Sequence, residues 1–455
     1  MYLYRHVQVS IVTSVMIHWH RTMIKIAGKT AVEISESIRT LMRDGELRPG
    51  DSLPPVRELA EVLAVNRNTV AAAYQRLVKM GIALTQGRLG TTLCEPPHAG
   101  EQEGLSVGTA LIDLADGNPD PRWLADVTTV PADCLPKPFL YGEDTILPAL
   151  RQLGDKWFGP DCPARWTLEL THGAVDAIER LVTAHLAPGD KVAVEDPCFL
   201  GTINAVRLAG MQAVGVEMDE AGMQPDALAA ALDKGARAVL LTPRAHNPTG
   251  WSLTKRRAEA LRRVLGAHPD VLVIADDHFA LLAETPYHSV IPASTAHWAL
   301  VRSVSKGLGP DLRLAFVACD SETAERLQTR LAPGMTWVSH ILQAIVVACL
   351  TSEEVRQQLN GAREAYASRR NELRTALLAQ EIDVSPSSGG LNVWVPLPKA
   401  EKDVAYALAK RGWLVRLGSA FDVQGECQAI RVTVSKLQDG QAQRFALDLK
   451  ACLSS

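Results

Sequence analysis

The chain has 455 residues, which is long for a single hydrophobic core and predicts two or three domains. Its hydrophobic fraction of 47% and charged fraction of 22% are typical of a soluble globular protein, and no apolar run reaches the roughly 18 residues of a membrane helix. The formal net charge of −4 by itself argues against a nucleic-acid-binding protein.

The charge is, however, unevenly distributed. Residues 23–92 carry 10 Lys and Arg against 7 Asp and Glu, a net charge of +3, whereas residues 93–455 carry −9. A small basic module joined to a large acidic one suits a DNA-binding domain attached to a sensor. The 8 cysteines form no CxxC pair and no metal-ligand grouping, which predicts free thiols in a reducing cytoplasm and no metal site. Residues 1–22 show no cleavage site, and we expect them to be an uninformative N-terminal extension.

The first predicted domain, residues 23–92, begins with a helix. Apolar residues recur at helical spacing over residues 31–42, and glycine and proline between 45 and 50 end the pattern. A shorter helix follows Ser52 and two prolines, and a third helix begins with Asn66 or Asn68 as its cap. The segment 82–93 then alternates around a Gly-Arg-Leu-Gly turn, which predicts a two-stranded hairpin.

Two short helices joined by a tight turn and followed by a hairpin form a winged helix-turn-helix. In this arrangement the start of the second helix of the pair faces the major groove, which places Arg67, Asn68 and Thr69 against bases or phosphates. Arg57 on the preceding helix and Arg88 in the wing would hold the DNA backbone. The alternative is a generic three-helix packing module with solvated arginines.

The segment LRPGDSLPPVRELAEVLAVNRNTVAAAYQRLVKMG resembles the DNA-binding domain of GntR-type bacterial regulators. That family shares the proline-glycine turn, the LPxxRELA helix, the VxRxTV helix start and a GxGT wing. The resemblance implies a double-stranded DNA operator as partner. The positions that match residue by residue are Arg57, Arg67, Thr69, Gly90 and Thr91. Thr91 in the wing is thereby expected to be a DNA-binding residue as well.

A linker and a larger domain follow. Between Cys94 and Gly108 the chain is rich in Pro, Gly and Glu and lacks periodicity, which predicts a flexible linker over residues 93–110. After Ala110 short apolar runs alternate with longer amphipathic segments, so residues 111–455 are expected to form an α/β domain with a largely parallel sheet and a small C-terminal subdomain from about residue 350. Ligands of such sheets bind beyond the carboxyl ends of the strands.

Lys306 is the main candidate for chemistry in this domain. It follows an apolar strand and two serines, Ser303 and Ser305, and Arg313 comes seven residues later. A lysine amine forms a Schiff base with an aldehyde, and the serines and the arginine suit a dianionic phosphate. Taken alone, such a segment is more often a surface lysine after a strand.

Four further segments match the requirements of a phosphorylated pyridine aldehyde. Asp276 ends a strand and could keep a pyridine nitrogen protonated, and Asn247 lies in a proline-braced loop from which its amide could reach a ring hydroxyl. Gly173 and Ala174 begin a helix whose backbone N–H groups could meet a phosphate. Phe199 could stack on a planar ring.

These segments, in this order, resemble the fold-type I aminotransferases over residues 112–436. The resemblance implies pyridoxal 5'-phosphate as cofactor, with Lys306 as its Schiff-base lysine, Asp276 at the pyridine nitrogen, Asn247 at the ring hydroxyl and Phe199 on the ring face. It assigns the phosphate to Gly173, Ala174, Ser303, Ser305 and Arg313. Tyr141 resembles the tyrosine that reaches the phosphate of a neighbouring subunit, which implies a homodimer. Arg431 resembles the arginine that pairs with a substrate α-carboxylate, although a buried structural arginine is the alternative.

The fusion of the two parts is the signature of the MocR subfamily of GntR regulators, and within it the chain is most similar to regulators of vitamin B6 salvage. Two positions depart from the subfamily pattern. His278 replaces a tyrosine that helps hold the ring hydroxyl, and it can still bind the cofactor by hydrogen bonding. Ile146 replaces a glycine and is expected to reshape the substrate vestibule. Both departures bear on amino-acid turnover more than on cofactor binding.

Three functions therefore remain open. The first is a DNA-binding regulator whose aminotransferase-like domain senses pyridoxal phosphate, or an amino compound that reacts with it. The second is an active aminotransferase that transfers amino groups between an amino acid and a 2-oxo acid. The third is a pyridoxal-phosphate carrier that uses Lys306 as a reservoir.

Overall fold

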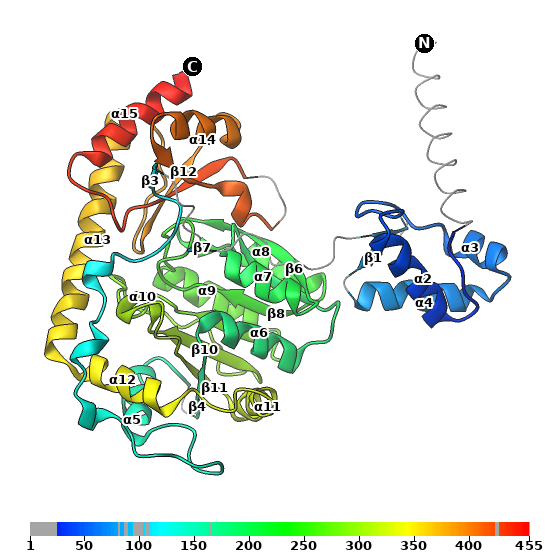
Figure 1. The fold of residues 1–455 in the computed structure, drawn as a ribbon, viewed down its shortest axis with the longest axis horizontal. Coiled ribbons are helices and arrows are strands. Elements are labelled where there is room, and N and C mark those ends of the chain that lie inside the picture. Colours follow the sequence, from blue (N-terminus) through cyan, green and yellow to red (C-terminus); the bar gives the residue numbers. More distant parts are fainter. Residues whose placement is uncertain are drawn as a thin grey trace. The chain divides into compact units, whose positions relative to one another are not determined.

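The computed structural model describes residues 25–80, 82–85, 90–93, 103–104, 110–163, 165–423 and 427–454. The chain separates into two compact units that divide near residue 100 (Figure 1). In the parts of the chain so described, no helix has the length and apolar character needed to cross a membrane.

The first unit has the predicted helix-turn-helix order. Its helices are α2 (Ala31–Arg43), α3 (Val56–Leu63) and α4 (Arg67–Lys79), followed by the antiparallel strands β1 (Ala83–Thr85) and β2 (Thr91–Leu93). The buried side chains Ile34, Ile38, Leu59, Val70 and Leu77 join the three helices in one core. The winged-helix prediction is therefore confirmed at the level of its elements.

The ends of these helices follow capping chemistry. The Thr30 side chain accepts from Glu33 N, and the Glu33 side chain accepts from Thr30 N, which forms a capping box at the start of α2. Asn66 caps α4 by accepting from Asn68 N at 2.9 Å, which decides between the two predicted caps. Ser52 lies opposite Thr92 in an isolated β-bridge, so it does not lead directly into α3.

The second unit is built on an eight-stranded sheet with the order β4-β11-β10-β9-β8-β5-β6-β7. The pairs from β10 through β9, β8 and β5 to β6 are parallel, whereas β11 runs antiparallel to both of its neighbours and β7 closes a hairpin with β6. The strands are β4 (Thr167–Thr171), β5 (Lys191–Asp196), β6 (Gln212–Asp219), β7 (Gly222–Met223), β8 (Ala236–Leu241), β9 (Leu272–Asp276), β10 (Trp298–Ser303) and β11 (Ala315–Cys319). The predicted α/β domain with a mainly parallel sheet is confirmed.

Helices cover both faces of this sheet, because its strands are apolar on both sides. Val273 and Ala275 of β9 pack into one core cluster, whereas Leu272 and Ile274 pack into another. The first cluster includes α5 (Pro148–Phe158), α8 (Pro225–Asp233), α9 (Lys255–Gly266) and α12 (His340–Thr351), and the second includes α6 (Ala174–His185), α7 (Leu200–Leu208) and α11 (Ser321–Leu331). The short helix α10 (Ser305–Leu308) follows β10 directly, at the carboxyl end of that strand.

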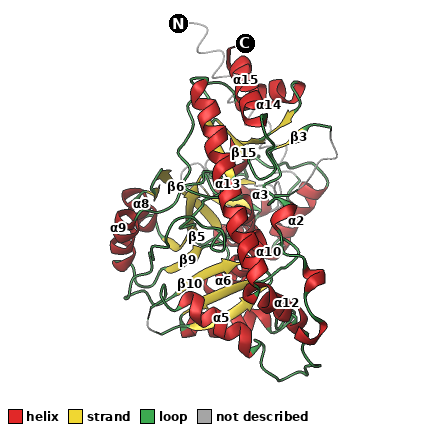
Figure 2. Ribbon diagram, turned by 90° about the vertical axis from the view of Figure 1, so that its left-hand side faces the viewer, coloured by secondary structure: helices red, strands yellow, loops and turns green. Residues whose placement is uncertain are grey.

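A smaller part with its own core completes this unit. The 27-residue helix α13 (Glu353–Ala379) leads to it from α12 (Figure 2). Its antiparallel sheet has the order β12-β15-β14, and β13 pairs with β3, which comes from the beginning of the domain. The remaining elements are β3 (Ile112–Asp113), β12 (Asn392–Pro396), α14 (Glu401–Lys410), β13 (Trp413–Leu414), β14 (Arg416–Leu417), β15 (Ala429–Thr433), α15 (Gln441–Ser454) and the short 3-10 helices Pro121–Trp123, Val127–Thr129, Ala132–Cys134 and Gly418–Phe421.

Candidate functional site

Lys306 lies in α10, immediately beyond the end of β10. Its Nζ atom donates a hydrogen bond to the Gly117 carbonyl oxygen at 2.8 Å. Burial lowers the pKa of Lys306, the nearby Glu103 carboxylate opposes that shift, and the Arg431 guanidinium adds to it. A lowered pKa increases the fraction of neutral amine, which is the form that attacks an aldehyde carbon.

Asp276 at the end of β9 presents a buried carboxylate. Its Oδ1 atom has no hydrogen-bond partner within the described chain, and its Oδ2 atom lies 3.6 Å from Nδ1 of His278. The Phe199 ring lies nearly parallel to the His278 ring, with an interplanar angle of 18° and a centroid distance of 6.3 Å. A buried, unpartnered carboxylate oxygen beside aromatic rings fits the protonated nitrogen of a pyridine ring.

Behind this carboxylate lies a pair of buried groups that the sequence analysis did not identify. The Glu195 carboxylate accepts from Thr242 N at 2.8 Å and lies 3.4 Å from His246 Nε2. Burial raises the pKa of Glu195 to about 8 and lowers the pKa of His246 to about 3. Burial thus favours the uncharged form of both groups, which lie within electrostatic range of Asp276 and His278.

The start of α6 supplies the geometry for a phosphate. Gly173 precedes the helix at φ +102°, a conformation that favours glycine, and Ala174 is its first residue. A Cβ atom at Gly173 would lie 2.9 Å from the Arg313 guanidinium, so a larger residue would push this guanidinium away from the start of the helix. An arginine over a helix N-terminus of exposed backbone N–H groups fits a dianion.

The two predicted serines lie at the same end of the sheet. The buried Ser303 Oγ accepts from Ser305 N at 3.2 Å, and Ser305 Oγ donates to the Leu312 carbonyl oxygen at 3.4 Å, next to Arg313. Thr171 Oγ1 donates to the carbonyl oxygen of Gly173 at 3.2 Å. The residues predicted to hold a phosphate thus come from three neighbouring segments of the fold.

Arg431 in β15 is fully buried and faces polar groups on several sides. Its Nη1 atom donates to Asn247 Oδ1 at 3.1 Å and to Glu103 Oε1 at 2.5 Å, and its Nη2 atom donates to the Ala115 carbonyl oxygen at 2.6 Å. Asn247 Oδ1 also accepts from Asn392 Nδ2 at 3.2 Å. Burial lowers the pKa of Arg431, and Glu103 opposes this shift. The sequence analysis did not identify Glu103, because it lies in the segment predicted to be a flexible linker.

Two other predicted positions lie apart from this group. Tyr141 is 93% exposed, and its ring packs edge-on against Trp337 with a centroid distance of 5.6 Å. Its contact with a neighbouring subunit stays a prediction. Ile146 is buried in the large core cluster, and its effect on the substrate vestibule stays a prediction. Its side chain contributes to the stability of the fold through apolar packing.

The predicted DNA-contacting residues differ in exposure. Arg67 and Asn68 are exposed at the start of α4, and Thr69 is half-buried beside them. Arg57 is exposed on α3 and pairs with Glu61 at 3.3 Å. Thr91 is buried, and its Oγ1 atom lies 3.3 Å from Thr85 Oγ1 across the hairpin. Arg88 lies outside the described residues.

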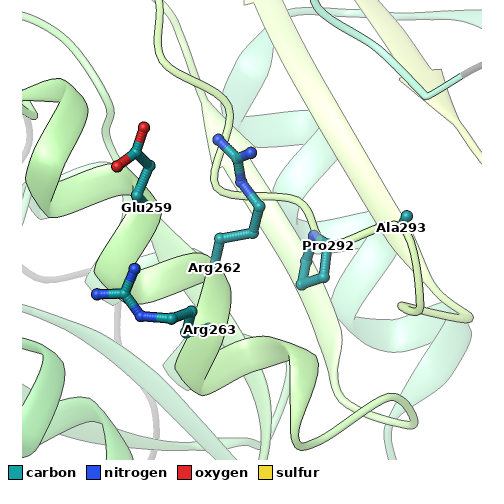
Figure 3. A pocket seen from close by; sticks show the side chains of 5 residues that line it. All are labelled: Glu259, Arg262, Arg263, Pro292 and Ala293. Atoms are coloured by element: carbon teal, nitrogen blue, oxygen red, sulfur yellow. The ribbon is translucent and has the colours of Figure 1, made fainter.

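A pocket of ≈ 370 Å³ lies elsewhere, on the surface beside α9. Figure 3 shows its lining by Glu259, Arg262, Arg263, Pro292 and Ala293. None of the predicted site residues lines this pocket. The described residues also contain no group of three His, Cys, Asp or Glu side chains that could hold a metal ion.

Family comparisons agree with this division of the chain. Residues 115–449 match the family of class I and II aminotransferases, and residues 30–93 match the gntR family of bacterial regulatory proteins. The chain belongs to the class I and II aminotransferase family and carries a GntR-type DNA-binding domain, the combination that defines MocR-type transcriptional regulators. Pyridoxal phosphate is the cofactor of its larger domain, and DNA is the partner of its smaller one.

Individual relatives carry the same architecture. The chain is 50% identical over 429 residues to the vitamin B6 salvage pathway transcriptional repressor PtsJ of Salmonella typhimurium, which covers 94% of this chain and 100% of the relative. It is 28% identical over 403 residues to the pyridoxine biosynthesis transcriptional regulator PdxR of Corynebacterium glutamicum, and this match covers 84% of this chain and 86% of the relative.

Solved structures show the same fold for the larger domain. Kynurenine aminotransferase of Pyrococcus horikoshii matches with a TM-score of 0.69 and 20% identity, covering 76% of this chain and 91% of that one. The α-aminoadipate aminotransferase LysN of Thermus thermophilus matches with a TM-score of 0.66 and 22% identity, and the match covers 76% of this chain and 92% of that one. At these identities the likeness establishes the fold and not the reaction.

Proposed function

We propose that pyridoxal phosphate is the effector of this regulator, and that its binding at Lys306 changes the affinity of the chain for an operator in front of vitamin B6 salvage genes. The observation that carries the proposal is the buried, unpartnered Asp276 Oδ1 atom beside the aromatic side chains of Phe199 and His278, in a chain that also has a GntR-type helix start. The 50% identity to a repressor of vitamin B6 salvage supports the choice of target.

Each residue of the site has a stated role in this proposal. The cofactor supplies an aldehyde that reacts with primary amines. Asp276 would keep a proton on the ring nitrogen, and Phe199 and His278 would confine the ring. The start of α6 and Arg313 neutralise the phosphate charge. Lys306 would provide the amine that binds the aldehyde group of the cofactor.

We further propose that the protein acts as a homodimer. Each subunit has its DNA-binding domain at residues 23–92 and a linker over residues 93–110 that is anchored to the larger domain at Glu103 and Gly104. The resemblance of Tyr141 to the tyrosine that reaches a neighbouring subunit supports this, and its 93% exposure leaves the side chain accessible to such a partner. A dimer carries two winged-helix domains, which suits an operator of two half-sites.

The test is operator affinity with and without the cofactor. The full chain is used to select a duplex from random DNA, and its dissociation constant is then measured by fluorescence anisotropy at fixed salt. Saturating pyridoxal phosphate is expected to change this constant by about 5- to 150-fold, the range of a coupling free energy of 1–3 kcal/mol. Equal constants with and without the cofactor contradict the proposal.

Replacement of Arg67 by alanine tests the DNA-contacting role of α4. Its side chain is exposed at the first position of that helix, so the change is expected to cost about 1–3 kcal/mol of operator binding without affecting the fold. Arg39→Ala is the matched control, because Arg39 is exposed on α2 and pairs only with Glu36 in the structure described. Equal losses for the two variants would assign Arg67 a general electrostatic role.

Amino-group transfer is the second candidate, and the buried Arg431 favours it, because a guanidinium beside Lys306 suits the carboxylate of an amino acid. A series of amino donors, each mixed with the loaded protein, tests this candidate through the absorbance of the bound cofactor. A series that leaves the absorbance unchanged argues against it.

A further inference from the structure

Glu103 belongs to the segment that joins the two units, ten residues after the end of β2, yet its side chain reaches the interior of the larger domain. Only 13% of that side chain is exposed. The segment is held there by a backbone hydrogen bond from Gly104 N to the Asp116 carbonyl oxygen at 2.9 Å. A carboxylate from the joining segment thus occupies the neighbourhood of Lys306.

The contact that Glu103 makes is an ion pair with Arg431. Its Oε1 atom accepts from Arg431 Nη1 at 2.5 Å and lies 3.5 Å from Asn247 Nδ2. Its Oε2 atom is buried and has no partner among the described residues, and the same holds for Nε of Arg431. The pair therefore uses one oxygen of the carboxylate and leaves part of the arginine unsatisfied. A free carboxylate in a two-pronged arrangement would satisfy more of these atoms.

The carboxylate also lies against Gly117, whose carbonyl oxygen accepts from Lys306 Nζ. A Cβ atom placed on Gly117 would lie 1.6 Å from Glu103 Oε1, and this glycine has φ +67°. Residue 117 must be small for Glu103 to enter. Glu103 also opposes the burial-induced lowering of the Lys306 pKa, as expected for a carboxylate close to the amine.

We propose that Glu103 is an internal carboxylate that occupies the Arg431 subsite, so that an amino acid binds only by displacing it. This inference rests on the proposed function, because it concerns the ligands that the cofactor-loaded site accepts. With Glu103 in place the site accommodates pyridoxal phosphate and rejects the carboxylate of an amino acid. An amino acid that displaces Glu103 releases the part of the chain that leads to the DNA-binding domain. Because Glu103 belongs to the same polypeptide segment, a change in the Arg431 subsite can alter operator binding.

The first test uses two amines that differ by a carboxylate. L-alanine carries both an amine and a carboxylate, whereas ethylamine carries the amine alone. Each is titrated into the full-length, pyridoxal-phosphate-loaded protein, and binding is followed by the absorbance of the bound cofactor. The proteins compared are wild type, Glu103→Ala, Glu103→Gln and Glu220→Ala. The last is the matched control, because Glu220 is an exposed carboxylate in the turn between β6 and β7.

The expected result is that Glu103→Ala binds L-alanine about tenfold more tightly than wild type, or better, because the competing internal ligand is gone. Glu103→Gln is also expected to bind L-alanine more tightly than wild type does. The affinity for ethylamine should be the same in all variants, and Glu220→Ala should bind L-alanine as wild type does. Equal L-alanine affinity in Glu103→Ala and wild type overturns the inference. An equal gain for ethylamine overturns it too, because the effect would not depend on a carboxylate.

A second measurement needs no variant. A glutamyl endopeptidase cleaves after glutamate and requires access to the side chain. In the loaded wild-type protein, L-alanine is expected to accelerate cleavage of the Glu103–Gly104 bond, identified by mass spectrometry, and ethylamine is not. Unchanged cleavage with saturating L-alanine contradicts displacement.

The two proposals fail in distinguishable ways. If wild-type protein shows no cofactor absorbance that depends on Lys306, the proposed function fails. If the cofactor binds and alters operator affinity while Glu103→Ala leaves L-alanine affinity unchanged, only the internal-carboxylate inference fails.

Discussion

Replacement of Lys306 by alanine is expected to abolish both the long-wavelength absorbance of bound pyridoxal phosphate and the response of operator binding to this cofactor. Lys306 supplies the amine of the site, close to Gly117 and Arg431. Alanine has no amine with which to form a Schiff base with the aldehyde of the cofactor. Operator affinity without cofactor should stay within about twofold of wild type, since the winged-helix unit has its own core.

The measurement combines absorbance with anisotropy on the same preparations. Lys402→Ala is the matched control, because Lys402 is an exposed lysine on α14. It should keep the absorbance and the full cofactor response. A Lys306→Ala protein whose operator affinity still changes on addition of pyridoxal phosphate would show that the response depends on noncovalent contacts alone, and the assigned role of Lys306 would be wrong.

Much of the fold was accessible from local sequence signals. The strands that precede Asp276 and Lys306 are apolar runs with no charge except Arg302, and the structure buries them on both faces of the sheet. The start of α4 follows from Asn66, a side chain that caps helices by accepting from the backbone. These signals are local in the chain, so a single sequence is sufficient to find them.

The contacts that the sequence did not reveal are long-range or depend on which way a side chain faces. Glu103 and Arg431 are separated by 328 positions, and the segment around Glu103 has the composition of a linker, so nothing local predicts its burial. Thr91 is one of the residues predicted to bind DNA; its side chain is buried, with the hydroxyl against that of Thr85 across the hairpin, and its DNA contact stays a prediction. In a short strand one face is buried and the other exposed, and composition alone does not assign the faces.

The neighbouring carboxylates Asp276 and Asp277 illustrate the same limit, because a strand sends successive side chains to opposite faces. Asp276 faces the site with an unpartnered oxygen. Asp277 is fully buried on the other side, where it accepts from Arg244 at 2.5 and 2.9 Å and from Arg302 at 2.9 Å. Arg302 also donates to Asp161 at 2.5 Å. We therefore propose that Asp277 contributes to the stability of the domain and that Asp276 binds the cofactor.

Replacement of Asp277 by asparagine is expected to lower the free energy of unfolding of the larger domain by about 3–5 kcal/mol, because it leaves the buried Arg302 and the largely buried Arg244 short of a counter-charge. Asp276→Asn changes the adjacent residue in the same way chemically, yet it removes no ion pair with an arginine and should change stability by less than about 1 kcal/mol. It should instead weaken pyridoxal phosphate binding by about tenfold or more, since an amide does not keep the ring nitrogen protonated. Denaturant unfolding of the ligand-free proteins and cofactor titration of each variant separate the two effects. If both variants lost stability equally, the division between a structural and a cofactor-binding carboxylate would be wrong.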